Sequence, residues 1–103
     1  MQLGIVLTDE QLLSHAIGLA TAAQQRTWNV RCFLTDRGVM GLADDSLAAM
    51  IRAGSLPTAV CELSVERYAE QVPHEFLTAG QIQVGGQYRN AEMVKHCDVT
   101  VVL

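Results

Sequence analysis

The chain has 103 residues, 50% of them hydrophobic, and a formal net charge of −4 at pH 7. This length and composition suit a single domain over residues 1–103 with one hydrophobic core. Lysines and arginines are scattered, without a run that could follow a phosphate backbone, so we expect no direct nucleic-acid binding. Asp9 and Glu10 interrupt the apolar start, so we expect no membrane span or signal peptide there and a cytoplasmic location.

The cysteines of the chain are Cys32, Cys61 and Cys97. An odd number without CxxC spacing argues against a disulfide framework and against a zinc or thioredoxin-type site. We therefore expect free thiols in a reducing compartment, no metal ion and no bound cofactor. Packing in the core is the expected role of Cys32 and Cys97.

The first two elements are predicted by residue type and by period. Gln2 to Leu7 is a short apolar run of strand-forming residues, and Thr8 with Gln11 forms a candidate capping box. Apolar residues then recur at three- to four-residue spacing until about Thr27, which predicts an amphipathic helix that packs on a sheet. The residues of this apolar face are Leu12, Leu13, Ala16, Ile17, Ala20 and Ala23.

A second strand and a second helix are expected in the next part of the chain. Asn29 to Thr35 has the composition of a strand, and residues 36–38 have turn chemistry at its carboxyl end. Asp44 or Asp45 is the candidate N-cap of the following helix, which Gly54 should terminate.

The third strand is expected to end at a cysteine. Pro57 precedes a candidate strand over Thr58 to Cys61. Ser64 is then the candidate N-cap of a brief helix that must end before Pro73.

The last part of the chain is less regular. Within residues 72–87, a short strand over Ile82 to Val84 and a loop are equal alternatives. Asn90 is the candidate cap of a helix over Ala91 to His96, and Asp98 to Leu103 is expected to close the chain as a buried strand.

The alternation of strands and helices predicts βαβ crossovers. An α/β fold with a mostly parallel sheet, covered by helices on both faces, follows from it. In such sheets, ligands and reactive groups gather outside the carboxyl ends of the strands. Cys61 falls at such an end.

Cys61 is the candidate reactive residue. A helix cap follows it within three residues, so the unpaired N–H groups and the partial positive charge of the helix start should lower its pKa. The thiolate is the nucleophile of sulfur chemistry, so this placement suits a sulfur-accepting cysteine. Free cysteines are also among the most often buried residues, and a packing role for Cys61 stays an equal alternative.

The spacing from Cys61 to Arg67 also matches the C-x5-R pattern of phosphatase loops. Such a loop needs small residues so that its N–H groups converge on an oxyanion. This segment instead carries Glu62 and Glu66, whose charges would repel a phosphate dianion. The charges therefore disfavour a phosphatase.

Several segments carry a resemblance to a known family. They are the opening strand and helix, CFLTDRGV (32–39), VCELSVER (60–67), EFLTAG (75–80) and AEMVKHCDVTVVL (91–103). In their order and spacing they resemble the DsrE/DsrF-like sulfur-relay family, which includes TusD-like proteins.

The resemblance implies a three-layer α/β/α sandwich with a mostly parallel sheet of four to five strands. It also implies a sulfurtransferase-type activity, in which Cys61 accepts sulfane sulfur as a persulfide and passes it to a partner thiol. Ser64 and Arg67 are the supporting neighbours that it suggests. The implied partners are sulfur donor and acceptor proteins, with a homo-oligomer or a hetero-oligomer of related subunits.

A second hypothesis belongs to a different class. The same family contains subunits without the active cysteine, which act in assembly. In that case the chain is a non-catalytic subunit or binding module, and Cys61 is packed in the core.

Overall fold

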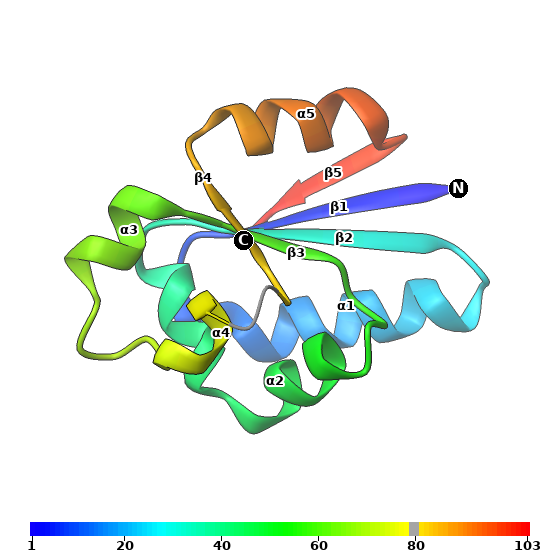
Figure 1. The fold of residues 1–103 in the computed structure, drawn as a ribbon. Helices are drawn as coiled ribbons and strands as arrows, with labels where there is room; N and C mark the ends of the chain where they lie inside the picture. The colour runs from blue at the N-terminus through cyan, green and yellow to red at the C-terminus, as the bar shows by residue number, and fades with distance from the viewer. Residues whose placement is uncertain (79–80) are drawn as a thin grey trace.

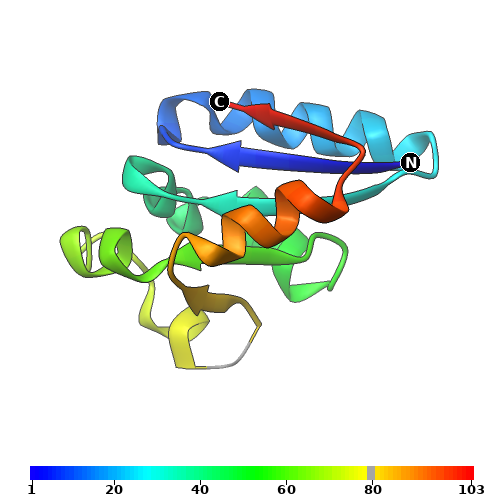
Figure 2. The same cartoon turned by 90° about the horizontal axis from the view of Figure 1, so that it is seen from above.

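Five short strands form one parallel sheet in the computed structural model, which describes residues 1–78 and 81–103. The strand order is β4-β3-β2-β1-β5, and every neighbouring pair is parallel (Figure 2). The strands are β1 (Gln2–Leu7), β2 (Asn29–Leu34), β3 (Thr58–Cys61), β4 (Gln83–Gly85) and β5 (Val99–Val102). The predicted α/β class with a parallel sheet is confirmed.

Helices cover both faces of the sheet, which makes a three-layer α/β/α arrangement. Figure 1 shows α1 and α2 on one face and α5 on the other. The α-helices are α1 (Leu13–Gln25), α2 (Asp45–Arg52), α3 (Glu62–Arg67), α4 (His74–Thr78) and α5 (Tyr88–His96). Two 3-10 helices, η1 (Glu10–Leu12) and η2 (Asp36–Ala43), follow β1 and β2.

The direction of the chain explains which helix lies on which face. From β1 to β4 each strand is added on the same side of the preceding one, whereas β5 returns to the opposite edge beside β1. Parallel crossovers are almost always right-handed, so reversing the direction of travel moves the connecting helix to the other face. The return from β4 to β5 therefore places α5 across the sheet from α1 and α2 (Figures 1 and 2).

Alternating side chains of the strands divide the core into two clusters. On the face of α1 and α2, buried residues such as Ile5, Leu34 and Val60 form the larger one. The smaller cluster lies on the face of α5 and has as its buried members Val6, Phe33, Cys61 and Met93. This alternation places Cys61 on the α5 side of the sheet, whereas Cys32 belongs to the larger cluster.

The second helix begins and ends as predicted. The carboxylate of Asp44 accepts hydrogen bonds from the backbone N–H groups of Ser46, at 2.9 Å, and Leu47, at 3.1 Å. After the helix, Gly54 adopts a φ of +73°, a left-handed conformation that glycine accommodates without strain.

Three predicted N-caps are wrong. The hydroxyl of Thr8 donates to the carbonyl of Leu103, and Asp9 instead accepts the N–H of Gln11. Asn90 lies inside α5, and Ser64 lies inside α3. Each is a short polar residue near a helix start, but for Asn90 and Ser64 the helix begins three residues earlier than residue type alone suggested.

Two connections differ in extent from the predictions. The turn expected at residues 36–38 continues as η2 to Ala43. Gly38 permits this path, because a Cβ atom there would lie 2.0 Å from the carbonyl oxygen of Leu7. The strand alternative for residues 82–84 is confirmed with a shift of one residue, as β4, and α4 was not predicted.

The EFLTAG segment of the resemblance extends over Ala79 and Gly80, which lie outside the described residues. In the described part of the chain, no helix has the length and the apolar character that crossing a membrane requires.

Candidate functional site

Cys61 is the last residue of β3 and the N-cap of α3. Its position at the carboxyl end of a strand is therefore as predicted. Val60 lies beside Leu34 of β2. The residues that follow them, Cys61 and Thr35, therefore lie side by side at the carboxyl ends of the two strands. On the other side, Cys61 pairs in register with Gly85 of β4. Three neighbouring strand ends thus meet at this thiol.

The thiol lies at a boundary between apolar and polar surroundings. Its side chain packs in the cluster of Val6, Phe33 and Met93 beneath α5, and Cys61 is 5% exposed. The polar groups around it come from the ends of β2 and the start of α3. A sulfur in this position is shielded from bulk water but still contacts hydrogen-bond donors.

The pKa of Cys61 is lowered, although burial acts in the opposite direction. Burial raises the pKa, because it penalises the charged thiolate. The hydroxyl of Ser64, the backbone N–H groups of Ser64 and Leu63, and the hydroxyl of Thr35 stabilise the thiolate and outweigh that effect. The net result favours the nucleophilic form of the thiol.

The donors at the start of α3 act on the charged sulfur more than on the neutral one. The side chain of Cys61 accepts no cap hydrogen bond, so the neutral thiol does not satisfy the N–H groups of Leu63 and Ser64 at the start of α3. An anionic sulfur attracts donors much more strongly, which is why the same N–H groups lower the pKa of Cys61. This difference between the two protonation states is the physical basis of the shift.

The hydroxyl oxygens of Ser64 and Thr35, near Cys61, each accept a hydrogen bond from another residue. The oxygen of Ser64 accepts the backbone N–H of Asp36 at 2.8 Å, and the oxygen of Thr35 accepts Nε2 of Gln87 at 3.3 Å. A hydroxyl that accepts from one side keeps its own proton for another acceptor. Both protons are therefore available to the sulfur of Cys61.

Arg67 lies on α3 but its guanidinium faces Asp36. Nη1 of Arg67 is 3.7 Å from Oδ1 of Asp36, which also accepts from the hydroxyl of Tyr68 at 3.3 Å. Asp36 adopts a φ of +51°, an uncommon conformation for a residue with a Cβ atom. Of the two predicted supporting residues, Ser64 is thus brought to the sulfur, whereas Arg67 pairs with Asp36 at the neighbouring turn.

The segment from Cys61 to Arg67 does not form a phosphate cradle. Glu62 to Arg67 is a helix, so its N–H groups follow a helix axis and do not encircle an oxyanion. Glu62 and Glu66 are both exposed on that helix. Among the described residues, no group of three His, Cys, Asp or Glu side chains could hold a metal ion.

The other two thiols are placed unfavourably for reaction. Burial raises the pKa of Cys32 to about 12. Burial also raises the pKa of Cys97, with a smaller opposing effect of the Arg31 charge. Cys61 is the cysteine whose surroundings favour the thiolate.

No protein-family model matches the chain, and no curated protein matches it.

Sequence reasoning missed Thr35, Asp36 and Gln87 as neighbours of the thiol. The available signal was the position of Thr35 and Asp36, at the carboxyl end of a predicted strand next to the one that ends at Cys61. Which strand ends adjoin depends on strand order, and that order is decided by packing across the whole sheet. Gln87 had no comparable signal, because it follows the shortest strand, β4.

Proposed function

We propose that the protein is a sulfurtransferase-type relay protein that carries sulfane sulfur as a persulfide on Cys61. The lowered pKa of Cys61 at the carboxyl end of β3 is the observation that supports this function. The DsrE/DsrF-like resemblance, in which this cysteine is the carrier, supports the same role. It requires no metal ion and no cofactor.

The transfer consists of two displacements at sulfur. The Cys61 thiolate attacks the outer sulfur of a donor persulfide, forms a new S–S bond and releases the donor as a thiolate. An acceptor thiolate then attacks the outer sulfur of the Cys61 persulfide, and Cys61 leaves as a thiolate. Neither step changes the total number of electrons, so no external oxidant or reductant is needed.

The residues around Cys61 assist both steps in the same way. Cys61 is a thiolate before the first step and after the second, and the hydroxyls of Ser64 and Thr35 stabilise that charge. A low pKa also makes Cys61 a better leaving group in the second step. Arg67 contributes through Asp36, whose backbone N–H holds the oxygen of Ser64.

Intact mass spectrometry tests this function directly. The protein is incubated with cysteine desulfurase and cysteine, or with polysulfide, alongside the variants Cys61→Ser, Cys32→Ser and Cys97→Ser. We expect the wild type to gain the mass of one sulfur atom, to lose it on reduction, and to keep the gain in the Cys32 and Cys97 variants. A gain that persists in Cys61→Ser would refute Cys61 as the carrier.

A second function, assembly without transfer, is supported by the burial of Cys61. The residue is 5% exposed and shares an apolar cluster with Phe33 and Met93. If it serves packing only, iodoacetamide should modify Cys61 only after the chain unfolds. Modification of the folded protein below the pH at which ordinary thiols react would instead support transfer.

We also propose that the protein associates with itself or with related subunits, in a cytoplasmic setting that keeps its thiols reduced. Edge strand β5 supports this, because Val99 is 45% exposed and Val102 is 66% exposed there. Light scattering over a wide concentration range tests it. A monomeric mass throughout would contradict self-association.

A further inference from the structure

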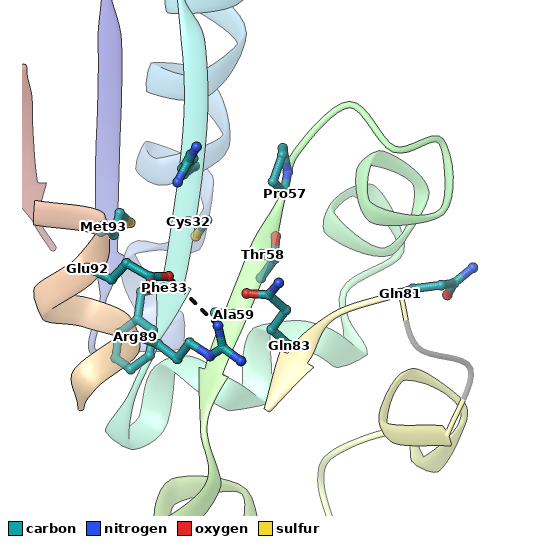
Figure 3. A pocket seen from close by; sticks show the side chains of 11 residues that line it. Cys32, Phe33, Pro57, Thr58, Ala59, Gln81, Gln83, Arg89, Glu92 and Met93 are labelled. Carbon is teal, nitrogen blue, oxygen red and sulfur yellow. Dashed lines mark ion pairs between the residues drawn. The ribbon is translucent and has the colours of Figure 1, made fainter. Parts of the chain in front are cut away.

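An open cavity lies on the α5 face of the sheet, away from the strand ends at Cys61. Its volume is about 440 Å³, and its walls come from β2, β3, β4 and α5. Helix α5 packs over β1, β2 and β3, and it meets the edge strand β4 only near Gly85, beside Tyr88 and Arg89. Cavities of about 300–1,000 Å³ are typical of small-molecule sites. Figure 3 shows the residues that line it.

Arg89 is the principal polar group of this cavity. In Figure 3 its side chain reaches from α5 toward β3 and Gln83. The Nε atom of Arg89 is buried and has no hydrogen-bond partner. Its remaining ion pair is loose, at 3.8 Å from Nη1 to Oε1 of Glu92. Nε is closed to solvent, so an acceptor in the cavity would reach Arg89 through its terminal nitrogens, and of these Nη1 has only the loose pair with Glu92.

The charge of the lining favours an anion. Arg31 and Arg89 line the cavity together with one carboxylate, Glu92, which leaves a local excess of positive charge. The whole chain carries a net charge of −4, so this cavity differs from its surroundings. Locally positive clefts attract anions and raise their local concentration.

The floor of the cavity is apolar. Ala59, which is half-buried, and Met93, which is 5% exposed, line it together with Phe33, which pairs with Ala59 across the sheet and is itself fully buried. A fully hydrated inorganic ion would make no apolar contact with this floor. An anion with an apolar body would satisfy the floor and the guanidinium at once.

We propose that this cavity binds a small organic carboxylate, with its carboxylate on the guanidinium of Arg89 and its apolar body over Ala59 and Met93. A planar carboxylate can accept two parallel hydrogen bonds from a guanidinium. Gln83, which also lines the cavity, adds an amide beside that position. This inference does not depend on sulfur transfer at Cys61.

Titration of the ¹⁵N-labelled protein with benzoate, followed by NMR, tests the proposal. Benzamide serves as the neutral probe of the same shape, and inorganic phosphate serves as the anion without an apolar body. We expect saturable shifts centred on Arg89, Gln83 and Met93 with benzoate, and binding of benzamide and phosphate weaker by about tenfold or more. Absent or non-saturable shifts with benzoate, or equal binding of benzamide or phosphate, would overturn the proposal.

Two variants with opposite expectations locate the carboxylate. Arg89→Gln removes the charge and should weaken benzoate binding by about tenfold or more. Glu92→Gln removes the carboxylate that competes for Arg89 and should strengthen binding. Arg26→Gln, at an exposed position after α1, is the control for loss of an arginine and should bind as the wild type does. Unchanged affinity in both cavity variants would contradict the assignment.

Discussion

The oxygen of Ser64 accepts the backbone N–H of Asp36 at 2.8 Å, which ties the first residue of η2 to α3. This bond crosses 28 positions of the sequence and lies directly beside the thiol of Cys61. Because Ser64 accepts from Asp36, its own proton is available to the sulfur. One hydroxyl thus serves both the local fold and the ionisation of the thiol.

Replacing Ser64 by Ala should change both properties. Loss of the hydroxyl removes a group that lowers the pKa of Cys61, so alkylation of Cys61 by iodoacetamide at pH 7 should slow by about threefold or more. The N–H of Asp36 also loses its acceptor, which should cost about 1 kcal/mol of unfolding free energy. Ser14→Ala, at an exposed site on α1, is the control. An unchanged alkylation rate in Ser64→Ala would remove Ser64 from the site.

Cys32 should make the protein less stable at alkaline pH. Its pKa is about 12 in the folded protein against an ordinary value of 9.0, because the buried thiol resists ionisation. Above the ordinary value the unfolded chain releases this proton while the folded chain retains it, so stability falls as pH rises toward the folded pKa. Urea unfolding above about pH 9, up to the folded pKa, should show a fall steeper by about 1.4 kcal/mol per pH unit than in Cys32→Ala. Equal slopes would show that Cys32 ionises freely when folded.

The left-handed conformation of Asp36 can be tested with two substitutions. Asp36→Gly and Asp36→Ala both remove the contacts to Arg67 and Tyr68, and they differ only in the Cβ atom. At a φ of +51° the Cβ atom is strained, so Asp36→Ala should be less stable than Asp36→Gly by about 0.5–1 kcal/mol. Chemical denaturation measures the difference. The opposite order would mean that the residue does not adopt this conformation in solution.

The close approach of η2 to β1 predicts a severe effect at Gly38. A Cβ atom there would lie 2.0 Å from the Leu7 carbonyl oxygen, and since backbone cannot move aside cheaply, Gly38→Ala should lose about 3 kcal/mol or more. At Gly18, within α1, a Cβ atom would have nothing within 4 Å. Gly18→Ala should therefore stabilise the protein by about 0.5–1 kcal/mol. Thermal denaturation of both variants checks the contrast, which equal effects would contradict.

Local patterns predicted the elements whose signals lie within a few residues. The three- to four-residue spacing of Leu13, Ala16 and Ala20 predicted α1, and all three are buried. Asp44 was predicted as a cap, and it accepts the N–H groups that a cap must accept. The caps predicted at Ser64 and Thr8 were wrong. Their hydroxyls form hydrogen bonds with Asp36 and Leu103, which are far away in the sequence, and not with N–H groups of the adjacent helix.

The sequence by itself determined the alternation of strands and helices and the position of Cys61 at a strand end, because both depend on local period and residue type. Only the tertiary structure decided that β5 returns beside β1, that α5 crosses the opposite face, and that Thr35 and Ser64 meet at the thiol. These features depend on contacts between segments far apart in the chain. Their free energy comes from packing the whole sheet, which no short stretch of sequence specifies.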